Sequence, residues 1–68
     1  MRFFEPKSYK LTESDKWIPS ANILECNAAV CEVTEEYSIR EKECNTEEEA
    51  NKFVTEFLVR KGFEEIKH

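Results

Sequence analysis

The sequence predicts an α+β fold, in which a three-stranded antiparallel meander sheet packs against one C-terminal α-helix in the order β-β-β-α. Apolar residues recur at helical spacing near the C-terminus, and residues 30–44 alternate between apolar and charged side chains. The chain has 68 residues, of which 40% are hydrophobic. That length has room for one helix against one sheet, so residues 1–68 are expected to form a single domain.

The helix is predicted from Thr46 to Gly62. Its apolar positions lie at i, i+3, i+4, i+7 and i+8, which form one face of a helix: Ala50, Phe53, Val54, Phe57 and Leu58. Thr46 and Glu49 have the spacing of a capping box, in which each side chain bonds to the other residue's backbone N–H. Gly62 is the only glycine, and it stands where a residue with positive φ ends a helix. Phe63 is then expected to fold back onto Leu58.

Three strands are expected before the helix. Residues 1–7 look like a loose N-terminal arm or an edge, because Pro6 lacks the N–H that a ladder needs. Residues 8–12 alternate apolar and polar side chains and predict the first strand. Residues 17–26 predict the second strand, and Pro19 favours an edge or a bulge near its start.

The second strand has two apolar sets, one on each face. The odd set is Trp17, Ala21 and Ile23, and the even set is Ile18, Leu24 and Cys26. A bulky indole is costly to leave in water, so we expect the odd set to face the helix. The open face of the sheet should then expose Ile18, Leu24 and Val30.

The third strand, residues 30–44, follows a turn at Asn27-Ala28-Ala29. A three-residue loop would pair Ile23 with Val33 and place Trp17 opposite Ile39. Residues 34–36 could bulge this strand or split it, and residues 63–68 could form a short extra strand or cap the core. The expected core is Trp17, Ile23, Val33, Tyr37, Ile39, Phe53, Phe57 and Leu58.

Two motifs are shared with a group of small uncharacterised bacterial domains. The first is Trp17-x-Pro19-x-Ala21-x-Ile23, preceded by Tyr9, and the second is Thr46-x-Glu48-Glu49-Ala50-x-x-Phe53, followed by Lys61-Gly62-Phe63. Over about residues 9–63 the chain resembles these domains, which implies a curved antiparallel sheet followed by one helix. Cys44 departs from the pattern, because a bulky apolar residue is expected before the helix cap. The resemblance implies no activity.

The net charge is −5, and it is concentrated in residues 32–49, which hold eight acids against two bases. Nucleic-acid binding requires a basic surface, so the distribution argues against a nucleic-acid partner. It also argues against an anionic membrane surface. No apolar run is long enough to span a bilayer.

Three cysteines leave several interpretations open. Cys26, Cys31 and Cys44 could bind zinc together with His68, but the C-x4-C spacing is not typical of zinc sites. A Cys26–Cys31 disulfide needs both side chains on one face, whereas the predicted register puts them on opposite faces. We therefore expect three inert free thiols, no metal, no cofactor and a cytoplasmic location. Cys44 lies beside the glutamates at the start of the helix, which should raise the pKa of its thiol.

The function expected from the sequence is a small non-enzymatic interaction or regulatory module. One helix on one sheet offers no deep cleft for paired catalytic carboxylates. The partner would be a protein, either a basic one or a second copy of the chain. An inhibitor encoded by a phage or plasmid, which presents acids to a nucleic-acid-binding protein, is one form of this hypothesis. The competing class is a metal- or redox-responsive cysteine protein. The candidate interaction residues are Ile18, Leu24, Val30, Glu32, Glu36 and Glu41.

Overall fold

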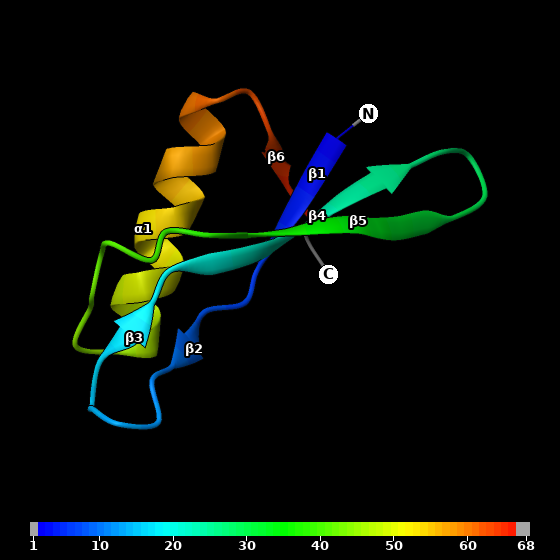
Figure 1. Ribbon diagram of the computed structural model, residues 1–68. Coiled ribbons are helices and arrows are strands. Elements are labelled where there is room, and N and C mark those ends of the chain that lie inside the picture. The colour runs from blue at the N-terminus through cyan, green and yellow to red at the C-terminus, as the bar shows by residue number, and fades with distance from the viewer. Residues whose placement is uncertain (1, 67–68) are drawn as a thin grey trace.

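A computed structural model describes residues 2–66 and shows an α+β fold with the helix on one face of a mixed sheet (Figure 1). Four strands form the main sheet in the order β5-β4-β1-β6, and β2 pairs with β3 in a separate two-stranded sheet. The expected meander of three strands is therefore wrong in strand number and order. The elements are β1 (Arg2–Pro6), β2 (Tyr9–Lys10), β3 (Trp17–Ile18), β4 (Ser20–Cys26), β5 (Cys31–Ser38), α1 (Glu47–Arg60) and β6 (Glu64–Glu65).

The N-terminal segment is a central strand and not a loose arm. β1 is antiparallel to β4 and parallel to β6, so it has a neighbour on each side. Phe4 is completely buried against the helix side of the sheet. Pro6 is tolerated because it is the last residue of the strand, opposite Ala21. The extra strand considered for the C-terminus exists as β6, and it is this strand that gives β1 its second neighbour.

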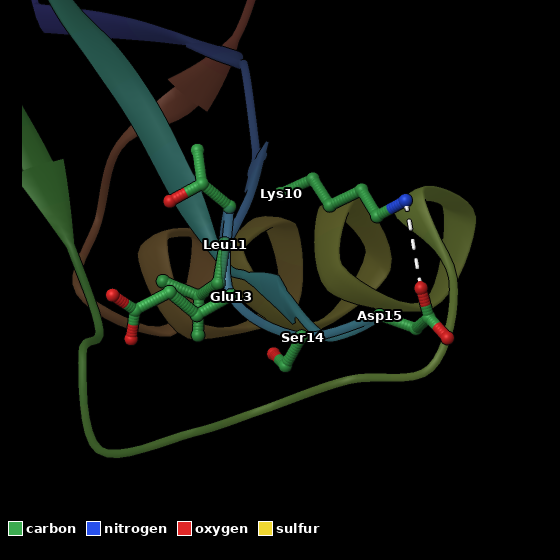
Figure 2. A pocket seen from close by; sticks show the side chains of 6 residues that line it. Lys10, Leu11, Glu13, Ser14 and Asp15 are labelled. Atoms are coloured by element: carbon green, nitrogen blue, oxygen red, sulfur yellow. Dashed lines mark ion pairs between the residues drawn. The ribbon is translucent and has the colours of Figure 1, made fainter.

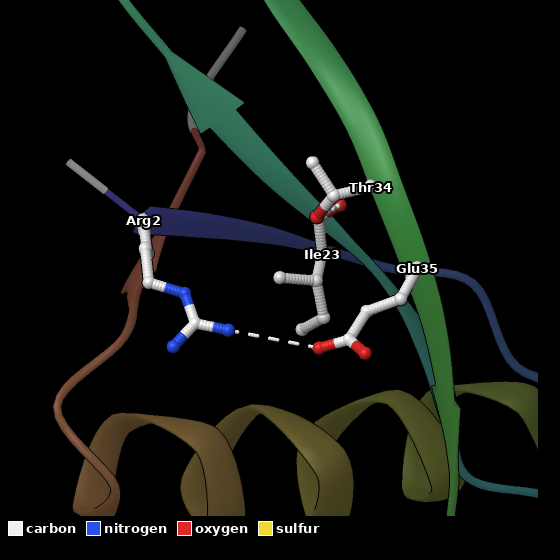
Figure 3. A network of polar contacts seen from close by, with 4 residues as sticks. All are labelled: Arg2, Ile23, Thr34 and Glu35. Atoms are coloured by element: carbon white, nitrogen blue, oxygen red, sulfur yellow. Dashed lines mark hydrogen bonds and ion pairs between the residues drawn. The ribbon is translucent and has the colours of Figure 1, made fainter.

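The β4–β5 hairpin has a different register from the one predicted. Cys26 pairs with Cys31 and Leu24 with Val33, but beyond a bulge Ile23 pairs with Glu35. The bulge expected within residues 34–36 is thus confirmed, with Thr34 as the unpaired residue. The Thr34 hydroxyl donates to the Ile23 carbonyl oxygen at 3.3 Å (Figure 3). Val33 pairs with Leu24 and so lies on the face opposite Ile23, outside the core. The bulge returns Tyr37 to the helix side, opposite Ala21.

Pro19 separates β3 from β4, so side chains do not alternate continuously from Trp17 to Cys26. Ile18 is consequently buried, with 3% of its surface exposed, and its expected place on the open face is wrong. β3 contacts the helix. Trp17 pairs with Cys44 instead of Ile39, through two backbone hydrogen bonds of 2.8 Å.

The core lies between α1 and the inner face of the main sheet. Its buried members are Phe4, Ala21, Ile23, Val54 and Leu58, and the half-buried Tyr37, Ile39, Phe57 and Phe63 pack around them. Tyr37 and Phe57 stack with their ring centroids 5.7 Å apart. Three expected core residues, Trp17, Val33 and Phe53, are not part of this cluster. Phe53 is 36% exposed.

The helix begins as predicted at its N-cap. Thr46 has extended backbone angles, and its hydroxyl accepts a hydrogen bond from the Glu49 N–H at 3.1 Å. The reciprocal bond differs from that of a capping box, because the Glu49 carboxylate accepts from the Asn45 N–H at 3.2 Å. The first bond satisfies a donor of the first helical turn, and the second holds the residue before the cap.

The helix ends in a Schellman motif. Phe63 N–H donates to the Leu58 carbonyl and Gly62 N–H to the Val59 carbonyl, each at 3.1 Å. Gly62 has a φ of 97°, which confirms the predicted positive φ. The turn brings the chain back along β1, where the Ile66 N–H donates to the Phe4 carbonyl at 2.8 Å.

Gly62→Ala should destabilise the fold by about 1–2 kcal/mol, through the cost of placing a Cβ at positive φ. Nothing lies within 4 Å of that Cβ, so no packing clash adds to the cost. Urea denaturation compared with the exposed Arg60→Ala variant measures it. Equal midpoints for the two variants would contradict the prediction.

Candidate functional site

The face of the main sheet opposite the helix carries a row of three apolar side chains, Phe3, Leu24 and Val33. Phe3 lies opposite Leu24, and Leu24 lies opposite Val33, so the row crosses β1, β4 and β5. Val33 is 56% exposed, and Phe3 and Leu24 are half-buried. We call this row and the residues on the same side of the sheet the open face. An uncovered apolar row of this kind is typical of interaction surfaces.

The predicted candidate residues are only partly brought together. Leu24 lies on the open face, Val30 lies in the hairpin loop and is 52% exposed, and Ile18 is buried elsewhere. The glutamates Glu32, Glu36 and Glu41 are all exposed, the first two on β5 and the third in the following loop. Sequence reasoning missed Phe3 and Val33. The adjacent Phe3-Phe4 pair was the available signal, because neighbouring residues of a strand point to opposite faces.

Carboxylates lie next to the apolar row. The next row of strand-paired residues on the open face is polar. In it, Glu5 on β1 pairs with Asn22 on β4, and Asn22 pairs with Glu36 on β5. Glu32 pairs with Glu25 and stands between Cys31 and Val33 on β5, so it lies on the helix side of the sheet, at the same end of the hairpin. Among residues 2–66, neither Glu32 nor Glu36 has an ion-pair partner. The open face therefore combines apolar surface with the carboxylate of Glu36, which has no ion-pair partner among the described residues.

Glu35 differs from its neighbours because it points to the helix side (Figure 3). Its carboxylate lies 3.6 Å from the Arg2 guanidinium, and both side chains are more than half exposed. The same guanidinium lies 4.8 Å from the centre of the Phe63 ring. Arg2 thus contacts both β5 and Phe63, the residue that follows the closing turn of the helix. We therefore assign Glu35 a structural role. An ion pair this exposed contributes little to stability.

The outer edge of β5 is unpaired, since β5 is the terminal strand of the main sheet. The Asn27 N–H donates to the Val30 carbonyl at 3.0 Å, and successive pairs of an antiparallel ladder alternate between bonded and non-bonded. Cys26–Cys31 and Leu24–Val33 are therefore non-bonded pairs. The Cα atoms of Cys26 and Cys31, 4.0 Å apart, have the close approach typical of such pairs. The N–H and C=O groups of Cys31 and Val33 consequently point to the free edge.

Cys26 and Cys31 form a disulfide, which corrects the expectation of three free thiols. The loop has four residues instead of three, so the two side chains are directly opposite each other on the open face. The Asn27 side chain fixes this loop by accepting from the N–H groups of Ala29 and Val30 at 2.9 and 3.0 Å. The argument from free thiols to a cytoplasmic location no longer holds.

Cys44 is the remaining cysteine, and it is free and buried, with 1% of its surface exposed. Burial raises the pKa of its thiol, Glu49 raises it further, and Lys42 opposes the shift. The predicted direction is thus confirmed, although loss of water contributes more than the glutamate. A buried thiol with a raised pKa is a poor nucleophile.

Cys44 should resist alkylation by iodoacetamide at neutral pH while the protein is folded, and react readily in denaturant. Because the folded pKa is raised, folding stability should fall as the pH increases past the ordinary thiol pKa, where only the unfolded thiol ionises freely. Mass spectrometry after timed alkylation tests the first statement. Alkaline denaturation of Cys44→Ala beside the wild type tests the second, and identical pH profiles would contradict it.

The loop between β2 and β3 encloses a hollow lined by residues 10–15 (Figure 2). The Lys10 ammonium lies 3.7 Å from the Asp15 carboxylate across it, and the Asp15 side chain is fully exposed. The Leu11 N–H closes the loop by donating to the Lys16 carbonyl at 3.0 Å. Because these charges remain in water, the hollow lacks the desolvated, convergent groups of a catalytic site.

Within residues 2–66 no cluster of histidine, cysteine or acidic side chains has metal-binding geometry, and His68 lies outside that range. No helix in this part of the chain is both long and apolar enough to cross a membrane. Comparison with protein families, with curated proteins and with solved structures finds no match for this chain.

Proposed function

We propose that the chain is a small non-enzymatic module that binds a protein partner through the open face of its sheet. The observation that carries the proposal is the row Phe3–Leu24–Val33, which lies opposite the helix and on the same face as the Glu36 carboxylate. A binding role of this kind needs no cofactor and no catalytic cleft. The acidic surroundings favour a protein partner over nucleic acid.

The helix offers less apolar surface to a partner. Its buried residues Ala50, Val54 and Leu58 pack against the sheet. Phe53 is partly covered, because the Lys42 ammonium lies 5.2 Å from the centre of its ring. Val59 is 54% exposed but stands apart from the core. Single exposed apolar residues are normal on protein surfaces, whereas a continuous row is not.

A photo-crosslinking amino acid at position 33 tests the proposal, with the same amino acid at position 59 as the matched control. Val33 and Val59 are similarly exposed, but they lie on the open face and on the helix. We expect position 33 alone to form a protein adduct in cells that produce the chain, either with a second copy or with another protein. Equal adducts from both positions, or none from position 33, would contradict the proposal.

A second candidate function is a redox-responsive hairpin, which the Cys26–Cys31 disulfide favours. A dithiol reductant would supply two electrons and two protons, convert the bond to two thiols and become a disulfide itself. Cys31 is exposed, so a reductant can reach the bond. The disulfide lies beside Leu24 and Val33, so its reduction would loosen the same end of the open face.

Loss of the disulfide should lower stability by about 2 kcal/mol, because the closed ring is only six residues long. That corresponds to a fall in Tm of roughly 10 °C for a domain of this size. Cys26→Ser/Cys31→Ser should stay folded, and the amides near the hairpin loop should show a larger increase in exchange rate than those of the core. If the disulfide stays oxidised in glutathione buffers set to the reduction potential of the cytosol, it serves only to stabilise the hairpin. That result would exclude the redox function.

A further inference from the structure

We infer that the partner contributes an extended segment that adds to the free edge of β5, with an apolar residue beside Val33 flanked by lysine or arginine. This inference rests on the proposed function and specifies which part of a partner is bound. Three features carry it: the hydrogen-bonding groups of the edge, the apolar row that reaches the edge, and the charge beside it.

The edge supplies backbone groups for an added strand. The N–H and C=O groups of Cys31 and Val33 point away from β4, as the alternation of the hairpin ladder requires. The hairpin extends away from α1, so the helix does not cover this end of the edge (Figure 1). The disulfide holds Cys31 in place before any partner binds, which lowers the entropy cost of adding a strand.

The apolar row specifies one side chain of the added strand. Phe3, Leu24 and Val33 are directly paired across three strands, and Val33 is the member at the edge. Its pairing with Leu24 places Val33 on this face, because directly paired residues share one face of a sheet. An apolar residue beside Val33 would extend the row to a fourth strand and bury the most exposed member of it.

The negative charges of β5 disfavour a second copy of the chain as the strand that adds to this edge. β5 contains Glu32, Glu35 and Glu36 and no basic residue. Antiparallel pairing of two β5 strands would therefore bring six carboxylates to one seam, within two chains that each carry a net charge of −5. Like charges across a strand pair are destabilising. Glu32 on the helix side and Glu36 on the open face instead favour cations on both faces of the added strand, while Glu35 is already paired with Arg2.

The test uses a nine-residue probe, Thr-Lys-Lys-Lys-Ile-Lys-Lys-Lys-Thr, which carries lysines on both faces of an added strand. The probe is added to the isotopically labelled chain and followed by NMR. Two control peptides replace every lysine with glutamate, or the isoleucine with proline, which removes an edge hydrogen bond. We expect the lysine probe alone to slow amide exchange at Cys31 and Val33. Its binding should weaken severalfold between low salt and about 0.15 M salt, because the ion pairs are exposed.

Charge reversal on the protein gives the matched comparison. Glu32→Lys/Glu36→Lys should lose the lysine probe and bind the glutamate peptide, whereas Glu41→Lys/Glu43→Lys should bind as the wild type does. The second pair changes the net charge equally, and both residues are exposed in the loop after β5. Equal losses of lysine-probe binding in the two double variants, or changes in amide exchange confined to α1, would overturn the inference. A crosslinked protein partner at position 33 with no response to the lysine probe would reject the edge inference and leave the proposed function standing.

Discussion

Phe4→Ala is expected to leave the protein largely unfolded at 25 °C. Phe4 has no exposed surface, lies on the central strand and packs with Ile23, Val54 and Leu58. Truncation of a buried phenylalanine costs about 3–5 kcal/mol. The whole stability expected for 68 residues is roughly 3–10 kcal/mol, so little would remain.

The matched control is Phe53→Ala, which removes the same ring from a position that is 36% exposed. We expect this variant to keep a cooperative thermal transition with a much smaller loss of stability. Circular dichroism melts of both variants make the comparison. If Phe4→Ala melted within a few degrees of Phe53→Ala, β1 would not be the central strand of the core.

Leu58→Ala should destabilise the fold by about 2–5 kcal/mol, and its neighbour Val59→Ala by less than 1 kcal/mol. Leu58 is 1% exposed and contacts the core, whereas Val59 is 54% exposed. Leu58 also provides the carbonyl that accepts from the Phe63 N–H, and the substitution leaves that bond in place. Urea denaturation therefore measures side-chain burial alone, and similar midpoints for the two variants would show that the helix faces the sheet differently.

The helix was predictable from the sequence because its signals are local. The apolar spacing, the Thr46 cap and the positive φ at Gly62 each depend on residues within two turns of one another. The structure shortens the predicted helix only by assigning Thr46 as the cap and Lys61 and Gly62 to the closing turn.

The sheet was less predictable because its order depends on contacts distant in sequence. β1 is central only because β6, some sixty residues later, returns beside it through the Gly62 turn. Pro6 seemed to exclude a strand, but a proline at the last strand position removes no interior bond. The local pattern therefore favoured an arm, and only the distant pairing with β6 makes this segment a central strand.

The candidate site depended on a single residue of register. A loop one residue longer than predicted places Cys26 opposite Cys31, which permits the disulfide, and Val33 opposite Leu24 on the open face. The Thr34 bulge then shifts the residues that follow it by one position. Because strand side chains alternate, each one-residue shift moves a side chain to the other face. Leu24 was placed correctly, since it lies on β4 before either shift, and Glu32 and Glu36 remain exposed in both registers.

Methyl relaxation by a soluble paramagnetic agent tests most directly whether the open face is uncovered in solution. The agent should broaden the methyl signals of Val33 strongly and those of Leu24 partly. The methyl signals of Ile23 and Val54, which lie between the helix and the sheet with at most 2% exposed surface, should be nearly unaffected. Protection of Val33 and Leu24 equal to that of Ile23 would contradict the account, because the apolar row would then be covered or turned inward.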